Sequence, residues 1–487
     1  MIKTLLIGCG YHAKRIYVPH LKENKNIRIS AVFDIVSKKE DIKTYLKEQG
    51  TCDVELFFTD DLRISDNLSK KDTELLDEIV EKNKIDAIII STEPLAHYKY
   101  AKWALERGLH ILMDKPITTE YDVSISHKKA KKIYSDYLKL KKLYLKKIKE
   151  KNISFILQAQ RRYHEGFQKT RELIKEIANK TNCPITSVQV FHSDGQWRFP
   201  REIIEQDYHP YNQGYGKMSH SGYHGLDVAI WFTKSSILDS DKKYNNFEVY
   251  SQVVRPVDFI KQLNKNDYQN IFPSISKDNL MSQKEFENES KKDKSKSVTG
   301  EIDAHSLIAL KHDKYTITNI GVHAVHNGFG QRNWESVIGR DLYKGNGRVR
   351  HESYIIEQGP FQSIIVNSYQ SHEIFKSDID KYEVGGEYHY DIHVFRNSAL
   401  FPEYKTYELL TMKELRGVED LNYSRGHQEN ARRNCVEDFV LSINNNSSPK
   451  KEISNFLSHD LSTQILSSIY RSVSKKGKVI RDKIKNE

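Results

Sequence analysis

The chain has little cysteine, and this scarcity excludes two classes of protein. Only four of its 487 residues are cysteines, and they lie far apart with no C-x-x-C pair. Such spacing excludes a disulfide scaffold and a cysteine-based zinc site, and it is typical of a reducing compartment. The four are Cys9, Cys52, Cys183 and Cys435.

Long apolar runs are also missing. No stretch approaches the ~20 consecutive apolar residues that a membrane span requires, which excludes a transmembrane protein. The first apolar run, residues 4–7, is too short for the apolar core of a signal peptide. With 29% charged residues and a mean hydropathy of −0.66, the composition is that of a soluble protein. We therefore expect a cytoplasmic location.

The net charge of +10 is concentrated in one segment. Residues 126–151 carry eleven lysines against two carboxylates, which accounts for nearly the whole excess. Apolar side chains within it recur at helical spacing, so we interpret it as a basic surface helix. The alternative is a basic arm that binds an anionic polymer, a membrane or a partner. Nothing else resembles a nucleic-acid-binding module, so nucleic acid is not an expected partner.

The length suggests two or three domains, and the first half predicts a doubly wound α/β fold. Short apolar strands are predicted at 4–8, 27–33, 87–91, 110–113 and 154–160. Helices are predicted between them at 13–23, 43–49, 72–82 and 95–107. Alternating strands and helices indicate a parallel sheet with right-handed crossovers. We predict a Rossmann dinucleotide-binding domain over 1–155, with the basic helix included.

The remainder predicts a second, α+β domain over 156–487, for substrate binding and homo-oligomerisation through a large, mostly antiparallel sheet. Strands are predicted at 188–192, 247–254, 306–310, 316–322, 362–369 and 388–395, with few helices between them. Two helices are predicted near 430–443 and 459–472. Residues 277–297 are nearly devoid of apolar side chains, so we expect a mobile insertion there.

A phosphate-binding loop follows the first predicted strand. Residues 8–13 read G-C-G-Y-H-A, a G-x-G-x-x-A pattern between a strand and a helix. Gly8 permits a tight turn, Gly10 lets a pyrophosphate approach the backbone, and Ala13 allows close packing of helix and strand. The helix N-terminus presents unpaired N–H groups to the phosphates. The pattern predicts dinucleotide binding, with Tyr11 and His12 also in the loop.

An acidic residue ends the second predicted strand. Asp34 lies 24 residues after Gly10, near the spacing expected for a ribose-binding carboxylate. A carboxylate there accepts hydrogen bonds from the ribose hydroxyls and repels a 2′-phosphate, which favours NAD over NADP. Lys38 and Lys39 follow closely and leave NADP possible. The alternative for Asp34 is a simple turn residue.

A more specific pattern lies at residues 91–116, which read STEPLAHYKYAKWALERGLHILMDKP. His97 precedes Lys115 by 18 residues. With Thr92, Asp114 and Pro116, this segment resembles the glucose-fructose oxidoreductase / inositol dehydrogenase (Gfo/Idh/MocA) family of NAD(P)-dependent oxidoreductases. The family pattern is T-P-N-x-x-H followed by E-K-P. Here E-P replaces P-N, and aspartate replaces the glutamate. The resemblance implies that Thr92, His97, Asp114, Lys115 and Pro116 lie at the cofactor.

A second block resembles the same family in the other predicted domain. Residues 214–227 match its pattern G-G-G-x-x-x-D-x-G-x-H-x-x-D at Gly214, Gly216, Gly222, His224 and Asp227. The usual catalytic aspartate is replaced by His220. Three nearby histidines, His209, His220 and His224, would also suit a metal, but no carboxylate stands at convincing ligand spacing, so no metal is expected.

The chemistry assigns roles to three residues. Oxidation of a secondary alcohol requires removal of the hydroxyl proton as hydride leaves, and histidine titrates near neutral pH. We predict His224 as the general acid/base, Lys115 as its charge-stabilising partner, and His220 as a polar partner in the proton relay. The substitution at His220 also leaves open that the chemistry is altered or lost.

The substrate is expected to be a sugar, cyclitol or nucleotide-sugar, because the resembling family acts mostly on these. Five cationic residues flank segments that should approach the substrate and would hold a phosphate or carboxylate. They are Arg161, Arg162, Arg198, Arg201 and Lys217. Two other functions stay open from the resemblance: a regulatory protein that senses a dinucleotide or sugar without turnover, and an NAD-dependent glycoside hydrolase.

Overall fold

The structure is a computed structural model that describes residues 1–51, 53–60, 66–206, 209–275, 280–292, 298–333, 347–371, 379–416 and 427–484. Cys52 and residues 277–279 and 293–297 of the predicted insertion lie outside these ranges. The chain forms two compact units, and neither is continuous in sequence. Unit 1 comprises Met1–Glu120, Lys132–Tyr163 and His427–Thr463. Unit 2 comprises Tyr121–Lys131, His164–Gly426 and Gln464–Glu487.

Unit 1 contains the predicted Rossmann fold. Its six parallel strands follow the order β3 (Glu55–Thr59), β2 (Ile27–Ile35), β1 (Ile2–Ile7), β4 (Ala87–Ile90), β5 (His110–Met113), β6 (Phe155–Leu157). Helices of this unit are α1 (Tyr11–Arg15), α2 (Tyr17–Glu23), α3 (Lys39–Glu48), α4 (Lys70–Asn83), α5 (Pro94–Glu106) and α14 (His427–Asn444). The central strands are buried on both faces, as the apolar run Ala87–Ile90 shows. The predicted doubly wound fold is confirmed.

Helix α14 shows why a single boundary near residue 155 does not describe the units. Its side chains Cys435, Val436 and Phe439 are fully buried in one apolar cluster with Leu6 and Leu112 of the Rossmann sheet. This contact is not encoded by local patterns, since more than 320 residues separate the partners in the sequence. Burial of this helix face joins the segment His427–Thr463 to unit 1.

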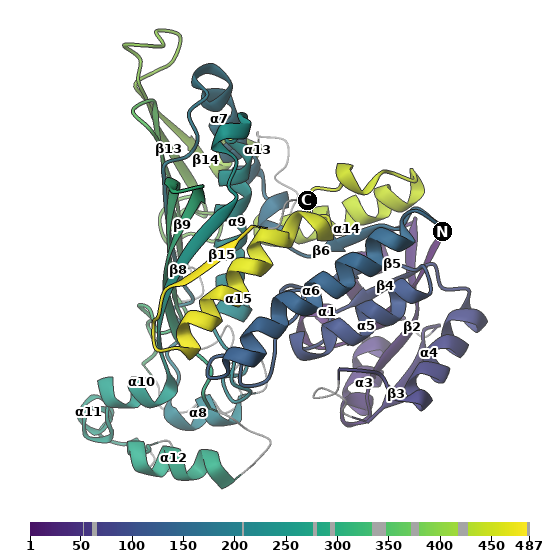
Figure 1. The fold of residues 1–487 in the computed structure, drawn as a ribbon. Coiled ribbons are helices and arrows are strands. Elements are labelled where there is room, and N and C mark those ends of the chain that lie inside the picture. Colours follow the sequence, from purple (N-terminus) through teal and green to yellow (C-terminus); the bar gives the residue numbers. More distant parts are fainter. Residues whose placement is uncertain are drawn as a thin grey trace. The chain divides into compact units, whose positions relative to one another are not determined.

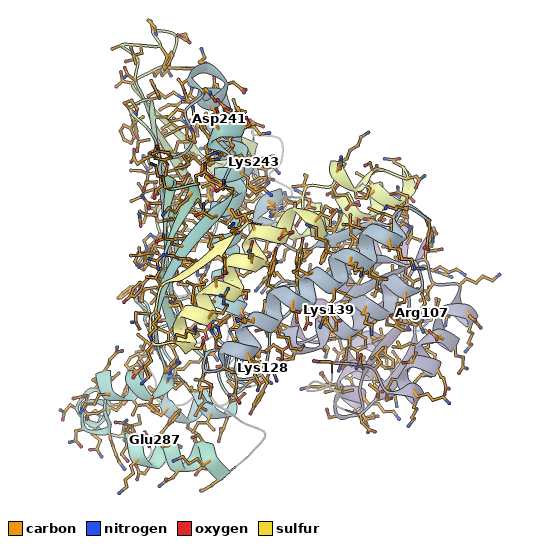
Figure 2. All side chains as sticks on the ribbon, viewed as in Figure 1. Arg107, Lys128, Lys139, Asp241, Lys243 and Glu287 are labelled. Carbon is orange, nitrogen blue, oxygen red and sulfur yellow. The ribbon has the colours of Figure 1, made fainter. Side chains whose placement is uncertain are left out.

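The basic segment forms α6 (His127–Lys147), as predicted. Ile133, Tyr137 and Tyr144 are fully buried along one stripe. Part of the lysine charge is balanced locally: Lys139, labelled in Figure 2, donates to the buried Asp136 at 2.8 Å. These contacts are those of an amphipathic surface helix.

Unit 2 is built on a mostly antiparallel sheet, also as predicted. Its order is β14 (Tyr407–Thr411), β13 (Asp391–Arg396), β12 (Gln362–Gln370), β11 (Arg350–Gln358), β7 (Ser187–Ser193), β10 (Tyr315–Val325), β9 (Asp303–His312), β8 (Asn246–Val254), β15 (Ile480–Lys483). Among these nine strands, only β7 and β10 pair in parallel. Figure 1 shows the sheet nearly edge-on, with α7 (Glu165–Thr181), α9 (Tyr223–Ser235) and α15 (Asp460–Ser474) on one side.

Helices in unit 2 were under-predicted. Beyond α7, α9 and α15, the unit has α8 (Pro200–Glu205), α10 (Pro256–Gln262), α11 (Lys265–Ile271), α12 (Gln283–Lys292) and α13 (Met412–Arg416). Helix α12 lies inside the predicted loop 277–297, so that prediction is wrong for these ten residues. Its Phe286 is fully buried in one cluster with Ile203 and Phe259, so this aromatic side chain anchors an otherwise polar helix.

Register in this sheet determines where the loops emerge. Ser193 at the end of β7 pairs with Val325 at the end of β10 and with His351 near the start of β11. The residues just beyond these strand ends therefore lie close together, at the end of the central strands. Asp194 and His326 are among them. Among the described residues, no helix is both long and apolar enough to cross a membrane.

Candidate active site

The glycine loop joins β1 to α1. Gly8 has φ +88°, and a Cβ there would lie 2.5 Å from the carbonyl oxygen of Ser91 and 2.8 Å from Cγ2 of Thr92. Only glycine therefore suits this position. A Cβ on Gly10 would meet no atom within 4 Å, so the protein leaves space beside that backbone. This geometry fits a dinucleotide whose pyrophosphate approaches Gly10.

Asp34 holds the glycine loop from the end of β2. Its Oδ2 accepts a hydrogen bond from the Cys9 N–H at 2.6 Å, and its Oδ1 accepts one from the Ile35 N–H at 2.6 Å. Burial raises the pKa of the Asp34 carboxyl, while these two N–H donors act in the opposite direction. The carboxylate thus lies against the predicted phosphate loop, in contact with the chain's own backbone.

Asp114 connects the loop to the end of β5. Its Oδ1 accepts from the Tyr17 hydroxyl at 2.5 Å, and its Oδ2 accepts from the Ser91 hydroxyl at 2.7 Å. His12 Nε2 lies 3.6 Å from the same carboxylate. Burial lowers the pKa of His12 to about 4, although Asp114 opposes the shift, so His12 is neutral at physiological pH. These contacts make Asp114 a positioning residue.

His97 joins the two loops that carry the family-like motif. The ring is fully buried, with Nδ1 2.8 Å from the Pro116 carbonyl oxygen and Nε2 3.0 Å from that of Thr92. Both ring nitrogens therefore face backbone carbonyls of the protein, and we assign His97 a positioning role. Because Pro116 follows Lys115 directly, this contact fixes the backbone beside the lysine. Burial lowers the pKa of His97.

All the residues predicted at the dinucleotide belong to unit 1. They are Gly8, Gly10, Tyr11, His12, Ala13, Asp34, Thr92, His97, Asp114, Lys115 and Pro116. Arg161 and Arg162, predicted at the substrate, belong to the same unit but are 5% and 1% exposed. Arg162 donates to the Ser458 hydroxyl at 2.7 Å and lies 3.3 Å from His459 Nδ1. These contacts favour a structural role for Arg162, and substrate binding by either arginine stays a prediction.

The second motif forms a distorted turn in unit 2. A Cβ on Gly214 would lie 2.4 Å from Asp122 Cα, and one on Gly216 would lie 2.0 Å from the Glu301 carbonyl oxygen. These glycines are therefore required by packing. The following residues form a π-helical turn, Met218–Gly222, in which His220 departs from helical backbone angles at φ −85°, ψ −114°.

The two predicted catalytic histidines lie at this turn and just after it. His220 is 4% exposed and stacks on His209, with ring centroids 4.6 Å apart. His224 is 5% exposed in the first turn of α9. Among the described residues, no three His, Cys, Asp or Glu side chains are arranged as metal ligands.

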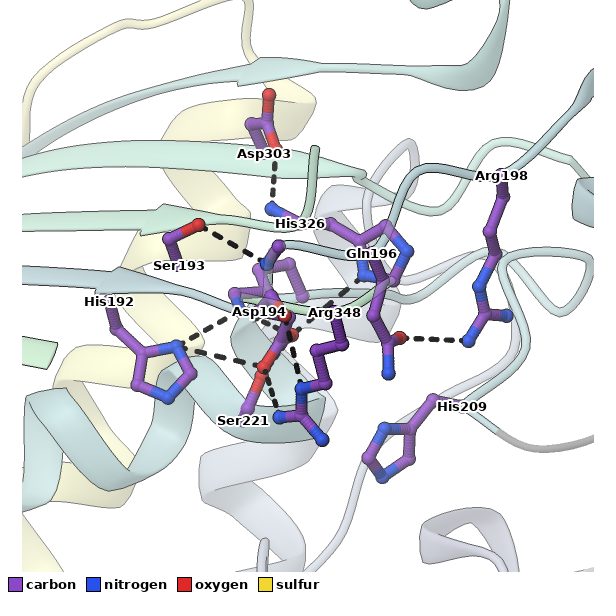
Figure 3. A network of polar contacts seen from close by, with 12 residues as sticks. His192, Ser193, Asp194, Gln196, Arg198, His209, Ser221, Asp303, His326 and Arg348 are labelled. Atoms are coloured by element: carbon purple, nitrogen blue, oxygen red, sulfur yellow. Dashed lines mark hydrogen bonds and ion pairs between the residues drawn. The ribbon is translucent and has the colours of Figure 1, made fainter. Parts of the chain in front are cut away.

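A buried polar network beside this turn was missed by sequence reasoning. Asp194 Oδ2 accepts from Lys217 Nζ at 2.5 Å and from the Ser221 hydroxyl at 2.8 Å. Arg348 lies 3.5 Å from Oδ1 of the same carboxylate (Figure 3). Burial would raise the pKa of Asp194, but Lys217 and the other donors hold it well below its usual range. Lys217 is fully buried here, so its side chain is committed to Asp194 and His192. Its predicted contact with the substrate therefore remains a hypothesis.

Comparisons with known proteins place the N-terminal region in a family. Residues 2–137 match the model of the oxidoreductase family with an NAD-binding Rossmann fold, GFO_IDH_MocA. A stretch of 119 residues is 26% identical to the uncharacterized oxidoreductase YhhX of Escherichia coli (strain K12). That match spans 24% of this chain and 28% of the relative's length.

Solved structures extend the likeness to the whole fold. The aldose-aldose oxidoreductase of Caulobacter crescentus aligns with a TM-score of 0.56 at 11% identity, over 98% of this chain and 99% of that one. The scyllo-inositol dehydrogenase of Lactobacillus casei aligns with a TM-score of 0.54 at 14% identity, over 99% and 98%. At such identities the likeness shows the fold alone. The match over residues 2–137 confirms the resemblance found in the motifs of the Rossmann domain: this part of the chain is similar to the Gfo/Idh/MocA oxidoreductases, with their NAD-binding fold.

Proposed function

We propose that this protein is an NAD(P)-dependent oxidoreductase acting on a hydroxyl-bearing carbon of a sugar, cyclitol or nucleotide-sugar. The observation that carries the proposal is the glycine loop, with Gly8 packed against Ser91, open space at Gly10 and Asp34 at the end of β2. A dinucleotide bound there would supply or accept the hydride at its nicotinamide ring. The sugar and cyclitol classes are supported by the aldose-aldose oxidoreductase and the inositol dehydrogenase that share the fold.

The protein's own residues would manage the proton. We assign His224 to take the hydroxyl proton during oxidation and to return it during reduction, because imidazole exchanges protons near neutral pH. Lys115 stabilises the negative charge that develops on the substrate oxygen. His220 acts as a polar partner in the relay. Its replacement of the family's usual aspartate favours, as a second candidate, a sensor that binds ligands without turnover.

We propose that NAD is preferred over NADP because Asp34 is acidic. Calorimetric titration is expected to show tighter binding of NADH than of NADPH. Asp34→Asn keeps an oxygen acceptor for the Cys9 N–H but removes the negative charge. It should therefore weaken NADH binding about tenfold and narrow the difference between the two nucleotides.

The matched control is Asp41→Asn. Asp41 is an exposed carboxylate on the neighbouring helix α3, and it pairs with Lys14 of α1. This variant should bind both nucleotides like the wild type. Tighter binding of NADPH by the wild type would reverse the proposed preference. Failure of both nucleotides to bind, with none already retained in the purified protein, would remove the oxidoreductase proposal itself.

We also propose homo-oligomerisation through the sheet of unit 2. One face of this sheet carries exposed apolar side chains, which alternate along their strands with buried ones on the other face. They include Phe191, Leu307 and Ile355, which are 36%, 57% and 41% exposed. Exposed apolar side chains on one sheet face are typical of an association surface. Sedimentation velocity should show a dimer or larger species, shifted toward monomer by Leu307→Glu. Leu238→Glu, at a 53% exposed leucine outside the sheet, should have no effect. A wild-type monomer at all concentrations would refute the proposal.

A further inference from the structure

Arg198 is a buried cation with incomplete hydrogen bonding. It lies between β7 and α8 and is only 1% exposed. Its Nη2 donates to Gln196 Oε1 at 3.0 Å (Figure 3). Its Nε and Nη1 atoms are buried and donate to no acceptor in the part of the chain that the structure describes. A guanidinium deprived of both water and acceptors is unfavourable, and native proteins rarely retain one without a reason.

Carboxylates near Arg198 are already bound to other cations. Glu202 and Asp194 both act on Arg198 electrostatically. Glu202 accepts two hydrogen bonds from Arg332, at 2.6 and 2.7 Å. Asp194 accepts from Lys217 at 2.5 Å. Arg198 therefore contributes a positive charge that these described carboxylates do not balance through direct contact.

This charge lies beside the turn that carries the predicted catalytic histidines. Tyr211 is close enough to act electrostatically on Arg198, and its ring centroid lies 5.8 Å from that of His220. Asp194, which also acts electrostatically on Arg198, accepts a hydrogen bond from the Ser221 hydroxyl of the same turn. All of these residues belong to unit 2, so the proximity does not depend on where unit 1 lies.

We propose that Arg198 is a specificity-determining residue that binds an anionic group, a carboxylate or a phosphate, on the substrate. Guanidinium N–H groups match the oxygens of both anions and form charge-assisted hydrogen bonds with them. The proposal rests on the oxidoreductase function above and narrows its substrate class to acidic or phosphorylated sugars. Burial lowers the pKa of Arg198 to about 10, a shift that a bound anion would oppose.

Thermal unfolding provides a test that needs neither turnover nor cofactor. Glucuronate, glucose 6-phosphate and inorganic phosphate are compared with glucose and with sodium chloride at matched ionic strength. Glucuronate identifies a carboxylate site, and the two phosphates identify a phosphate site. In the wild type, at least one anionic sugar should raise the Tm, because a ligand that binds only the native state stabilises it. Its affinity should exceed that of glucose about tenfold to a hundredfold.

Arg198→Met separates ligand binding from a structural role. If Arg198 binds an anion of the substrate, the variant without ligand should unfold at the wild-type Tm or above it. Adding the anion should then no longer raise the Tm of the variant. Arg198→Lys should keep a weaker response. A lowered Tm with an unchanged anion response would overturn the proposal, as would a wild type insensitive to all three anions.

The control is Arg481→Met, which changes a 71% exposed arginine that pairs with Glu248 in the same unit. It should retain the full anion response. NADH titration of the same samples keeps the two proposals distinct. NADH binding without an anion response removes only the anion site, whereas an anion response without NADH binding removes only the oxidoreductase function.

Discussion

Replacing His224 by alanine is expected to lower turnover by about 10²–10⁴-fold, the usual contribution of a positioned general base. NADH affinity should stay close to that of the wild type, because His224 belongs to unit 2 and the glycine loop to unit 1. The loss should appear in kcat and in kcat/KM alike. The measurement is absorbance of NADH at steady state, with a panel of sugars, sugar acids and cyclitols.

Because His224 is nearly buried, a second variant and a control are needed. His224→Gln preserves size and hydrogen bonding and should be as inactive as the alanine variant. His389→Gln changes a fully buried histidine that accepts from the Tyr369 N–H at 2.7 Å, away from the motif. It should cost stability but leave turnover per folded molecule unchanged. Equal activity of wild type and His224→Gln would rule out the general-base role.

The same panel separates the alternative functions. A sensor would bind NADH and a sugar but show no turnover even in the wild type, and His224→Ala would leave binding intact. A glycoside hydrolase with a tightly held dinucleotide would cleave substrate without net NADH production. Net reduction of added NAD by the wild type, lost in the variant, supports the dehydrogenase alone.

Lys217→Met is expected to lower the free energy of unfolding by about 3–5 kcal/mol, the usual cost of breaking a buried ion pair by removing one partner. The methionine leaves the Asp194 carboxylate without its shortest hydrogen bond inside unit 2. Urea denaturation followed by circular dichroism measures the loss. Asp194→Asn combined with Lys217→Met should recover part of it, because the double variant removes the carboxylate that Lys217 balanced; the recovery stays incomplete because Arg348, 3.5 Å from the same carboxylate, loses that ion pair.

This experiment also decides between two roles for Lys217. The sequence suggests a cation that binds the substrate, whereas the structure places Lys217 in an internal pair. A variant with unchanged stability and a raised KM would favour substrate binding. A destabilised variant whose folded fraction keeps the wild-type KM would establish the internal role.

What the sequence predicts correctly is local. Gly8, Gly10 and Asp34 lie within 27 residues, and their positions at the ends of the adjacent strands β1 and β2 follow from the local pattern. Their contact with a dinucleotide stays a prediction. The link between Thr92, His97 and Pro116 is likewise contained in one β-α-β segment. The parallel arrangement of the strands follows from the alternation of strand and helix patterns.

What it does not predict depends on distant partners. Asp194 stands in no motif, and its proximity to Arg348 follows from the register of β7 and β11. Its pairing with Lys217 depends on the turn before α9, which lies 23 residues further along the chain. Phe286 is a single apolar residue among polar ones, so no apolar periodicity predicts that α12 forms and packs against the rest of unit 2. Helix α7 does carry a local signal, the helical spacing of four buried apolar side chains: Phe167, Leu173, Ile174 and Ile177.

The return of α14 to the Rossmann sheet has a consequence for how the protein is made. During synthesis, the segment His164–Gly426 must leave the ribosome before α14 is available. At typical elongation rates this takes on the order of tens of seconds. Throughout that interval the nascent Rossmann sheet lacks the side chains of α14 that cover one of its faces. Val436 and Phe439 of α14 complete the apolar cluster that contains Leu6 and Leu112 of the sheet. The emerging chain therefore presents an apolar surface suited to a holding chaperone until α14, in the last eighth of the chain, has been translated.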